Sequence, residues 1–352
     1  MKENKSNINS LFHKRWLKFR LHKRGYYSLY IILICYFVSF LLPFLVNKDP
    51  LMVKYNGSYY YPVFKYYSAT TFGVQSNGEA NYRKLKLDIN EKKNDDFVLM
   101  PLYPYGPNEN LLDEINTIPP TPPTSNNWFG TDDRGRDVFA RVLYGFNVSV
   151  SFGLLVTLFS FMLGTIAGAL SGFYGGKTDI FFQRIVEVWS ALPFLYVIII
   201  LGSFITPGFS LLTFILVLLN WVGITLYVRG EVLREKVKEY VFASYVSGSS
   251  KFKIITKHIL PNSISPIVTF APFAVVGNIA LLVALDFLGF GLQPPTASWG
   301  QLIQQGMSYP TLERWWLIVI PLVFQFITLI LIVFIGEGFR DAFDSKQYSR
   351  LK

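Results

Sequence analysis

Six runs of about 20 predominantly apolar residues restrict the folds open to this sequence. A helix of about that length crosses a hydrocarbon core about 30 Å thick, and inside lipid a single segment satisfies its own backbone hydrogen bonds only as a helix. The sequence therefore predicts an all-α membrane protein with six transmembrane helices. The predicted spans are, approximately, Tyr27–Val46, Val148–Gly172, Ile185–Ile205, Leu211–Val228, Ile267–Phe287 and Trp316–Ile335.

Composition argues against a soluble enzyme and against a metal centre. Only 16% of the residues are charged, whereas about 25% is typical of soluble domains. The single cysteine, Cys35, lies inside the first apolar run and excludes both a disulfide framework and a cysteine-based metal site. The histidines, His13, His22 and His258, do not cluster in the sequence. We therefore expect no catalytic residue, no cofactor-binding residue and no metal ligand in this chain.

The distribution of basic residues predicts how the chain is oriented. Residues 1–26 hold eight Lys and Arg against one acid, 229–265 hold seven, and the tail 338–352 holds four. With six crossings, all three segments lie on the cytoplasmic side if the N-terminus does, as the positive-inside rule requires. The sequence thus predicts a multi-pass protein of the bacterial inner membrane with both termini in the cytoplasm. The net charge of +10 reflects this orientation better than it reflects nucleic-acid binding.

The first apolar run, 27–46, is expected to be a retained transmembrane anchor that follows a cytoplasmic basic lead. A secretory signal peptide is the alternative, but the apolar stretch is long enough to span the bilayer. The residues that end the run, Pro43 to Val46, also offer no small-residue cleavage site.

Residues 47–126 form an insert that is too long to be a simple loop. Tyrosine-rich segments and the pair Asn56-Gly57 predict short strands and a hairpin turn, so we expect mixed or β structure on the periplasmic side. Ile118 to Pro123 is expected to form a stiff, proline-rich linker at the end of the insert. The insert is either an exposed cap without a ligand or a docking surface for a substrate-delivery protein or partner subunit.

Residues 127–147 carry the pattern TDxxGRD, in which glycines permit tight turns and Asp and Arg side chains hold the turn together. Taken alone, the pattern predicts a surface turn that caps a helix. Its candidate residues are Gly130, Thr131, Asp132, Gly135, Arg136, Asp137 and Arg141.

The segment 229–265 reads as two short helices separated by a break. Gly248 supplies a left-handed residue at the end of the first helix, and Ser249 or Ser250 can cap the second. We expect Phe252, Ile255 and Ile259 to line one apolar face of the second helix, which Pro261 ends. The apolar side of this pair packs either against the protein's own helix ends or against a partner.

Three motifs in order resemble those of the dipeptide/oligopeptide/nickel permeases of ABC importers. The loop 240–262 resembles the "EAA" loop, with Gly248 at its glycine and Leu260-Pro261-Asn262 at its closing signature. The TDxxGRD pattern and the segment 286–300 resemble two other motifs of this family. The resemblance covers the first span and most of 127–345, and it is closest to the microcin C and peptide-uptake branch.

The resemblance implies a type I importer permease, with five spans in a core of residues 148–337. It implies a non-catalytic subunit that pairs with a second, non-identical permease, two ATPase subunits that bind ATP and Mg, and a periplasmic or lipid-anchored substrate-binding protein. It assigns contact with the ATPases to Tyr240, Phe242, Ala243, Ser244, Gly248, Lys251, His258, Leu260, Pro261 and Asn262. It also implies candidate residues for the transport pathway or its gate, which are Asp286, Gly289, Gly291, Gln293, Pro294, Pro295, Trp299 and Gly300.

The sequence departs from the family at two positions of the loop and in its insert. Phe242 stands where the family usually has Glu, Ser244 stands where it usually has Ala, and the insert is longer than in most members. The expected cargo is a peptide or peptide-like compound of the microcin C type, with nickel or an oligosaccharide as alternatives. A secondary transporter and a membrane-anchored sensor are the alternatives from other classes.

Two further patterns concern packing and a false motif. Gly164, Gly168 and Gly172 share one helix face, which predicts a close approach of another helix. Gly175-Gly176-Lys177-Thr178 resembles the end of a phosphate-binding loop, but Ser171 stands where that loop needs glycine. We expect a cytoplasmic turn there and no nucleotide site.

Asp286, near the end of a span, is expected either to line the pathway or to cap the turn at 289–291.

Overall fold

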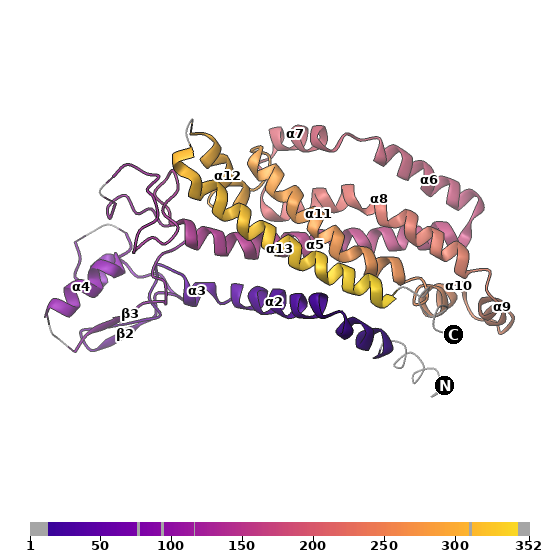
Figure 1. Cartoon of the computed structure of the whole chain (residues 1–352), viewed down its shortest axis with the longest axis horizontal. Helices are drawn as coiled ribbons and strands as arrows, with labels where there is room; N and C mark the ends of the chain where they lie inside the picture. The colour runs from indigo at the N-terminus through magenta and orange to yellow at the C-terminus, as the bar shows by residue number, and fades with distance from the viewer. Residues whose placement is uncertain (1–12, 76–77, 93–94, 116, 310–311, 344–352) are drawn as a thin grey trace. The chain divides into compact units, whose positions relative to one another are not determined.

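The computed structural model of the chain describes all residues except 1–12, 76–77, 93–94, 116, 310–311 and 344–352 (Figure 1). Helices dominate it, in agreement with the predicted fold class. The longer helices are α2 (Lys23–Ser39), α4 (Tyr82–Lys92), α5 (Val138–Tyr174), α6 (Gly176–Ser190), α7 (Phe194–Phe204), α8 (Phe209–Glu235), α9 (Glu239–Val246), α11 (Ser265–Phe287), α12 (Trp299–Met307) and α13 (Trp315–Phe343). The shorter elements are α3 (Leu42–Leu45), η1 (Ala69–Phe72), α10 (Lys251–Ile254), η2 (Ile255–Ile259), η3 (Leu312–Arg314) and strands β1 (Met52–Tyr55), β2 (Ser58–Tyr60) and β3 (Phe97–Leu99).

The six predicted spans correspond to six apolar helical segments in the same order. Helices α5, α8, α11 and α13 are each long and apolar enough to cross a membrane. Helices α6 and α7 meet at an angle of 73° and together make a fifth candidate span or a re-entrant loop. Helix α2 has 17 residues, close to the shortest length that spans a bilayer. Its exposed apolar side chains, among them Ile34 and Phe37, suit a surface that faces lipid.

Two spans differ from the predicted ones, one by a break and one in where its helix begins, and proline accounts for the break. Pro193 lies between α6 and α7 with an extended backbone, and because proline lacks an amide hydrogen and restricts the preceding residue, the helix ends before it. Helix α5 begins at Val138, before the predicted start of its span, and so includes part of the 127–147 segment.

The chain divides into two compact units. The first contains residues 1–33, 149–293 and 326–352, and the second contains residues 34–148 and 294–325. Each is described by itself below.

Glycines bring α5 and α8 together in the first unit, as the sequence predicted. A β-carbon placed on Gly164 would lie 2.4 Å from Ile224 Cγ2, and one on Gly168 would lie 2.6 Å from the Thr225 carbonyl oxygen. At Gly172 the nearest atom would be the Arg229 carbonyl oxygen at 2.9 Å. Only glycine therefore fits at this contact, since larger residues would meet backbone atoms of α8.

The insert in the second unit has a three-stranded antiparallel sheet with strand order β2-β1-β3. Asn56 and Gly57 both have positive φ and join β1 to β2, which confirms the predicted hairpin turn. Helix α4, which the sequence analysis did not anticipate, buries Tyr82, Leu85 and Ile89 in the same core as the sheet. The insert is thus a small α/β fold with an aromatic core, consistent with the mixed structure expected.

Candidate functional site

The loop between α8 and α11 has the helix–glycine–helix form that the sequence predicted. Gly248 follows α9 with a φ of +74°, and its amide donates to the Tyr245 carbonyl oxygen at 3.0 Å. Ser250 caps α10 by accepting a hydrogen bond from the Lys253 amide at 3.4 Å. Gly248 therefore occupies the left-handed position that reverses the chain between the two helices.

A buried apolar cluster fixes this loop to the ends of α5 and α8. Val241 and Ile254 are fully buried, and they pack with Ile259, Val228 and Val232. Burying each aliphatic side chain of this size contributes about 1.5–3 kcal/mol relative to exposure. The loop is therefore anchored to the helix ends, which was one of the two possibilities that the sequence left open.

One detail of the predicted apolar face is wrong. Phe252 is 76% exposed, whereas Ile254, Ile255 and Ile259 are buried. The reason is that residues Ile255–Ile259 form a π-helix, whose wider turn changes the angular spacing between successive side chains. The buried face therefore includes Ile254 in place of Phe252.

A polar network stiffens the base of the loop. The Glu235 carboxylate is buried and accepts hydrogen bonds from Lys238 Nζ and from the Tyr240 hydroxyl, both at 2.6 Å. Asn262 Nδ2 donates to the His258 carbonyl oxygen at 2.7 Å and to the Tyr240 hydroxyl at 3.2 Å. Burial and the neighbouring Glu235 raise the pKa of Tyr240 to about 12, so its hydroxyl keeps its proton. Glu235 and Lys238 were missed in the sequence analysis, although their i, i+3 spacing is a usable signal.

The outward side of the loop carries exposed apolar side chains. Phe242 is 58% exposed, Val246 is 90% exposed and Tyr245 is 43% exposed, and Phe252 lies beyond the glycine. We call these four residues the apolar loop surface. Large exposed apolar patches typically mark sites of protein interaction. Of the other candidates, Ala243, Lys251 and Pro261 are exposed, Leu260 is half-buried, and Ser244 is buried with its hydroxyl lacking a hydrogen-bond partner among the described residues.

The TDxxGRD segment is a buried hub and not the surface turn predicted from its pattern alone. Thr131, Asp132, Asp137 and Arg141 are completely buried, and Arg136 is 5% exposed. The Asp132 carboxylate accepts hydrogen bonds from the Arg136 amide at 2.9 Å and from Arg136 Nε at 2.7 Å. Charge-assisted hydrogen bonds of this kind make burial of the acid tolerable.

Asp137 caps helix α5, as predicted, and also accepts hydrogen bonds from residues outside that helix. Its Oδ1 accepts from the Ala140 amide at 2.8 Å in the first turn of α5, while its Oδ2 accepts from the Tyr103 hydroxyl at 2.7 Å and from Asn127 Nδ2 at 2.9 Å. Burial raises the pKa of Asp137 despite these hydrogen bonds. Tyr103 belongs to the insert, so the cap also connects the insert to α5, a role that sequence reasoning missed.

Arg141 and two tryptophans extend this hub to other parts of the second unit. Arg141 donates to the carbonyl oxygens of Pro107 at 3.0 Å and Thr296 at 3.3 Å. Trp299 Nε1 donates to the Val142 carbonyl oxygen at 2.9 Å, and Trp316 Nε1 donates to that of Thr131 at 3.1 Å. Glycines with positive φ at 130 and 135 form the turns of the motif. Among the pathway candidates, Trp299 and Gly300 are therefore buried packing positions in this unit.

Asp286 in the first unit closes the turn that follows α11. Its Oδ1 accepts a hydrogen bond from the Leu292 amide at 2.6 Å, and Gly289 adopts a φ of +82° within the turn. Gln293 Nε2 lies 3.5 Å from the carbonyl oxygens of Gly289 and Gly291. This contact gives Asp286 a capping position at the turn, which is one of the two roles expected of it. Pro294 and Pro295, in the second unit, are joined by a cis peptide bond.

The described residues contain no group of three His, Cys, Asp or Glu side chains that could hold a metal ion. Instead, the arrangement offers an anchored loop with an exposed apolar surface and two buried, hydrogen-bonded motif segments.

Residues 161–347, which contain this loop and the 286–300 segment, match the family described as binding-protein-dependent transport system inner membrane component. The chain belongs to this family of permeases. The permease is 41% identical to the inner membrane ABC transporter permease protein YejE of Escherichia coli strain K12, over 96% of this chain and 98% of that one. It is 36% identical to the peptidoglycan transport system permease protein YejE of Agrobacterium fabrum strain C58, over 96% of this chain and 93% of that one.

A shorter relative is the dipeptide transport system permease protein DppC of Bacillus subtilis strain 168, which is 36% identical over 71% of this chain and 78% of its own length. The resemblance inferred from the motifs is confirmed. The permease is a non-catalytic, multi-pass component of an ABC importer in the inner membrane, and it works with ATPase subunits and a substrate-binding protein. Family membership favours this function over a secondary transporter and over a membrane-anchored sensor.

Proposed function

We propose that this permease imports peptides or peptide-like compounds of the microcin C type. The observation that carries the proposal is the 41% identity to an Escherichia coli YejE protein over 96% of this chain, an extent that includes the insert. The dipeptide permease DppC matches only 71% of the chain. Relatives named for peptide and peptidoglycan transport support a peptide cargo over nickel or an oligosaccharide.

The proposed assembly contains this chain, a second and non-identical permease, two ATPase subunits and a periplasmic or lipid-anchored binding protein. ATP and Mg are bound by the ATPases, and this chain contributes no cofactor site. In the proposed orientation the basic segments 1–26, 229–265 and 338–352 lie in the cytoplasm, as the positive-inside rule favours. Both termini are then cytoplasmic, and the insert is periplasmic.

The apolar loop surface is the proposed contact with an ATPase subunit. Phe242 replaces the acid that the family usually has, so this contact relies on burial of aromatic surface more than on charge. Because the loop is anchored by Val241 and Ile254 and stiffened by the network around Tyr240, closure of the ATPases moves it as a rigid lever. Differential binding of ATP and loaded receptor then shifts a two-state equilibrium between inward- and outward-facing forms.

Photo-cross-linking in intact cells tests this contact. A photoreactive phenylalanine analogue at Phe242 or at Phe252 is expected to capture an ATPase subunit. The matched control is Phe64, which is 74% exposed but belongs to the insert, and which should capture no ATPase. Failure of both loop positions to capture an ATPase, with normal assembly and uptake, contradicts the proposed contact.

Uptake assays test the cargo. Cells that depend on this permease should accumulate a labelled tripeptide, and the accumulation should disappear when the gene is deleted. Nickel and a short oligosaccharide are supplied in parallel. Gene-dependent uptake of either of these without uptake of peptides contradicts the proposed cargo.

A further inference from the structure

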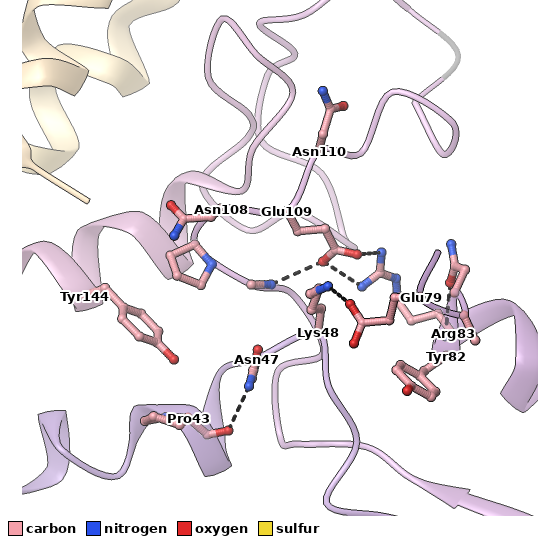
Figure 2. A pocket seen from close by; sticks show the side chains of 14 residues that line it. Pro43, Asn47, Lys48, Glu79, Tyr82, Arg83, Asn108, Glu109, Asn110 and Tyr144 are labelled. Atoms are coloured by element: carbon pink, nitrogen blue, oxygen red, sulfur yellow. Dashed lines mark hydrogen bonds and ion pairs between the residues drawn. The ribbon is translucent and has the colours of Figure 1, made fainter. Parts of the chain in front are cut away.

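A polar pocket of about 680 Å³ lies within the second unit (Figure 2). Its walls include Lys48, Glu79, Arg83 and Glu109 from the insert, together with Pro43 from α3 and Tyr144 from α5. The volume is within the range of about 300–1,000 Å³ that small-ligand sites occupy. Because α3 and α5 flank the insert in sequence, the pocket lies where the insert joins the helices before and after it.

Two ion pairs dominate the walls of this pocket. The Lys48 ammonium bonds to the Glu79 carboxylate. Arg83 donates to Glu109 through two parallel hydrogen bonds, from Nη1 at 3.0 Å and from Nη2 at 2.6 Å. Figure 2 shows the carboxylates of Glu79 and Glu109 and the cationic groups of Lys48 and Arg83 close to one another. Arg83 also donates to Glu114, which lies outside the lining, from Nε at 3.1 Å and from Nη2 at 2.9 Å, so each of its N–H groups already has an acceptor. The lining itself presents two cationic and two anionic side chains.

The charged groups are held in place by contacts with other parts of the insert. Arg83 lies 4.6 Å from the centre of the Tyr105 ring and donates to the Pro104 carbonyl oxygen at 2.6 Å. Glu109 also accepts from the Gly106 amide at 3.3 Å. Such preorganisation lowers the entropic cost of binding, because these side chains are already ordered.

The balance of charge selects among possible ligands. A nucleotide or another polyanion would meet Glu79 and Glu109, a bare cation would meet Lys48 and Arg83, and an apolar ligand would leave four charged groups without water. A zwitterion of peptide size satisfies both signs at once. The amide side chains of Asn47, Asn81 and Asn108, which also line the pocket, both donate and accept hydrogen bonds, as peptide groups require.

We propose that this pocket binds short zwitterionic peptides, with the peptide ammonium beside Glu79 and Glu109 and the peptide carboxylate beside the Lys48 ammonium. The proposal rests on the proposed function, because it assigns the insert a binding step for the same class of cargo. The peptide shares the existing ion pairs rather than replacing them. The charged termini, more than the side chains, then determine affinity.

Equilibrium binding of radiolabelled trialanine to the full-length permease in lipid nanodiscs tests the proposal. The wild-type protein should bind trialanine at least tenfold more tightly than N-acetyl-trialanine amide, which lacks both charges. The variants Lys48→Met and Glu79→Gln should each weaken trialanine binding at least tenfold. Thermal melting of each variant establishes that it is folded.

Lys54→Met is the matched control, because Lys54 forms an ion pair with Asp95 at 3.2 Å in the same insert but does not line the pocket. It should bind trialanine as the wild type does. Equal affinity for charged and blocked peptides, or unchanged binding by folded Lys48→Met and Glu79→Gln, overturns the proposal. Absence of any trialanine binding also overturns the proposal. A cross-linker placed at Asn108 tests the alternative that this surface docks the substrate-binding protein, and capture of that protein without trialanine binding overturns the proposal too.

Uptake by the assembled transporter separates this proposal from the proposed function. If cells import trialanine but the nanodisc-embedded permease does not bind it, the pocket proposal fails and the peptide cargo stands. If cells import nickel or an oligosaccharide in place of peptides, the proposed function itself fails.

Discussion

Asp286 and Gly291 close the turn after α11 with almost no free space between them. A β-carbon on Gly291 would lie 1.8 Å from Asp286 Oδ1, the atom that accepts the Leu292 amide. Backbone atoms of Asp286 lie within 3 Å of the same point, so rotation of one side chain cannot relieve the clash. Glycine at 291 is therefore required by the close approach of a buried carboxylate.

We expect Gly291→Ala to destabilise the permease by about 1–3 kcal/mol, because overpacking displaces Asp286 from the Leu292 amide. Thermal melting of the purified protein in detergent measures this loss. Gly277→Ala in α11, where no heavy atom lies within 4 Å of the added carbon, is the control and should melt as the wild type does. Equal melting temperatures for the two variants contradict the conclusion that the contact between Asp286 and Gly291 requires glycine.

The surroundings of Asp49, a residue of the insert, disfavour ionisation of its carboxyl group. Burial and the nearby Glu79 raise the pKa of Asp49 to about 6, against the opposing influence of Lys48. Since the folded state holds this proton more tightly than the unfolded state does, Asp49 contributes stability below its unfolded pKa of about 3.9. That contribution is lost as the pH rises through about 6.

Hydrogen exchange of the β1 amides should therefore become less protected between pH 4 and pH 7, after correction for intrinsic rates. Asp49→Asn, which imitates the protonated acid, should remove this pH dependence and leave the insert more stable at pH 7. Asp95→Asn, at a fully exposed carboxylate, should leave the dependence unchanged. A slope that persists in Asp49→Asn contradicts the assignment.

Single residues were predicted from sequence where the backbone alone decides their role. Gly248 and Asn56-Gly57 were identified because positive φ restricts the residue type, and those positions are confirmed. Roles that depend on distant partners were missed. Tyr103 bonds to Asp137 across the sequence, and nothing local to either residue predicts that contact.

Among the helices, α5 and α8 depend on the three glycines at their contact. Gly168→Ala should force the helices apart, because the added carbon would meet the Thr225 carbonyl oxygen at 2.6 Å and the Arg229 amide nitrogen at 3.0 Å. We expect a loss of about 1–3 kcal/mol in stability. Gly223→Ala, where no heavy atom lies within 4 Å of the added carbon, is the matched control in α8 and should be neutral or slightly stabilising.

Thermal melting and uptake measured on both variants check this expectation. A Gly168→Ala protein with wild-type melting would mean that the helices separate without cost, and the glycine contact would then have no structural importance.

The spans were predictable as elements because a membrane leaves an apolar segment few alternatives to a helix. The interruption at Pro193 was not anticipated, since the run 185–205 is predominantly apolar on both sides of the proline and the proline's effect depends on how the chain continues. Helix α4 was missed because its polar and charged residues, such as Arg83 and Lys84, obscure the apolar positions Leu85 and Ile89. The π-helix at Ile255–Ile259 likewise has no sequence signature that simple periodicity detects.

For the molecule as a whole, the sequence predicted the family and the class of function more completely than the chemistry of any one site. The motifs at 131–137, 240–262 and 286–300 carried the family resemblance, and the match over 161–347 supports it independently. The charge distribution also predicted an orientation. The hub around Arg141 and the polar pocket required the structure, because both assemble residues that lie far apart in the chain.

The proposed contact between the apolar loop surface and an ATPase predicts that coupling of ATP hydrolysis to transport depends on the turn at Gly248, which joins the two parts of that surface. Gly248→Pro cannot adopt a φ of +74° and cannot donate to Tyr245, so the relative placement of α9 and α10 is lost. Because the spans are unaffected, we expect normal membrane insertion, ATPase activity that continues, and uptake reduced at least tenfold. Gly248→Asn, which keeps the amide and tolerates the left-handed region, should retain most uptake. Uptake and ATP hydrolysis measured on the same reconstituted transporter distinguish uncoupling from loss of assembly, and normal uptake by Gly248→Pro contradicts a coupling role for this loop.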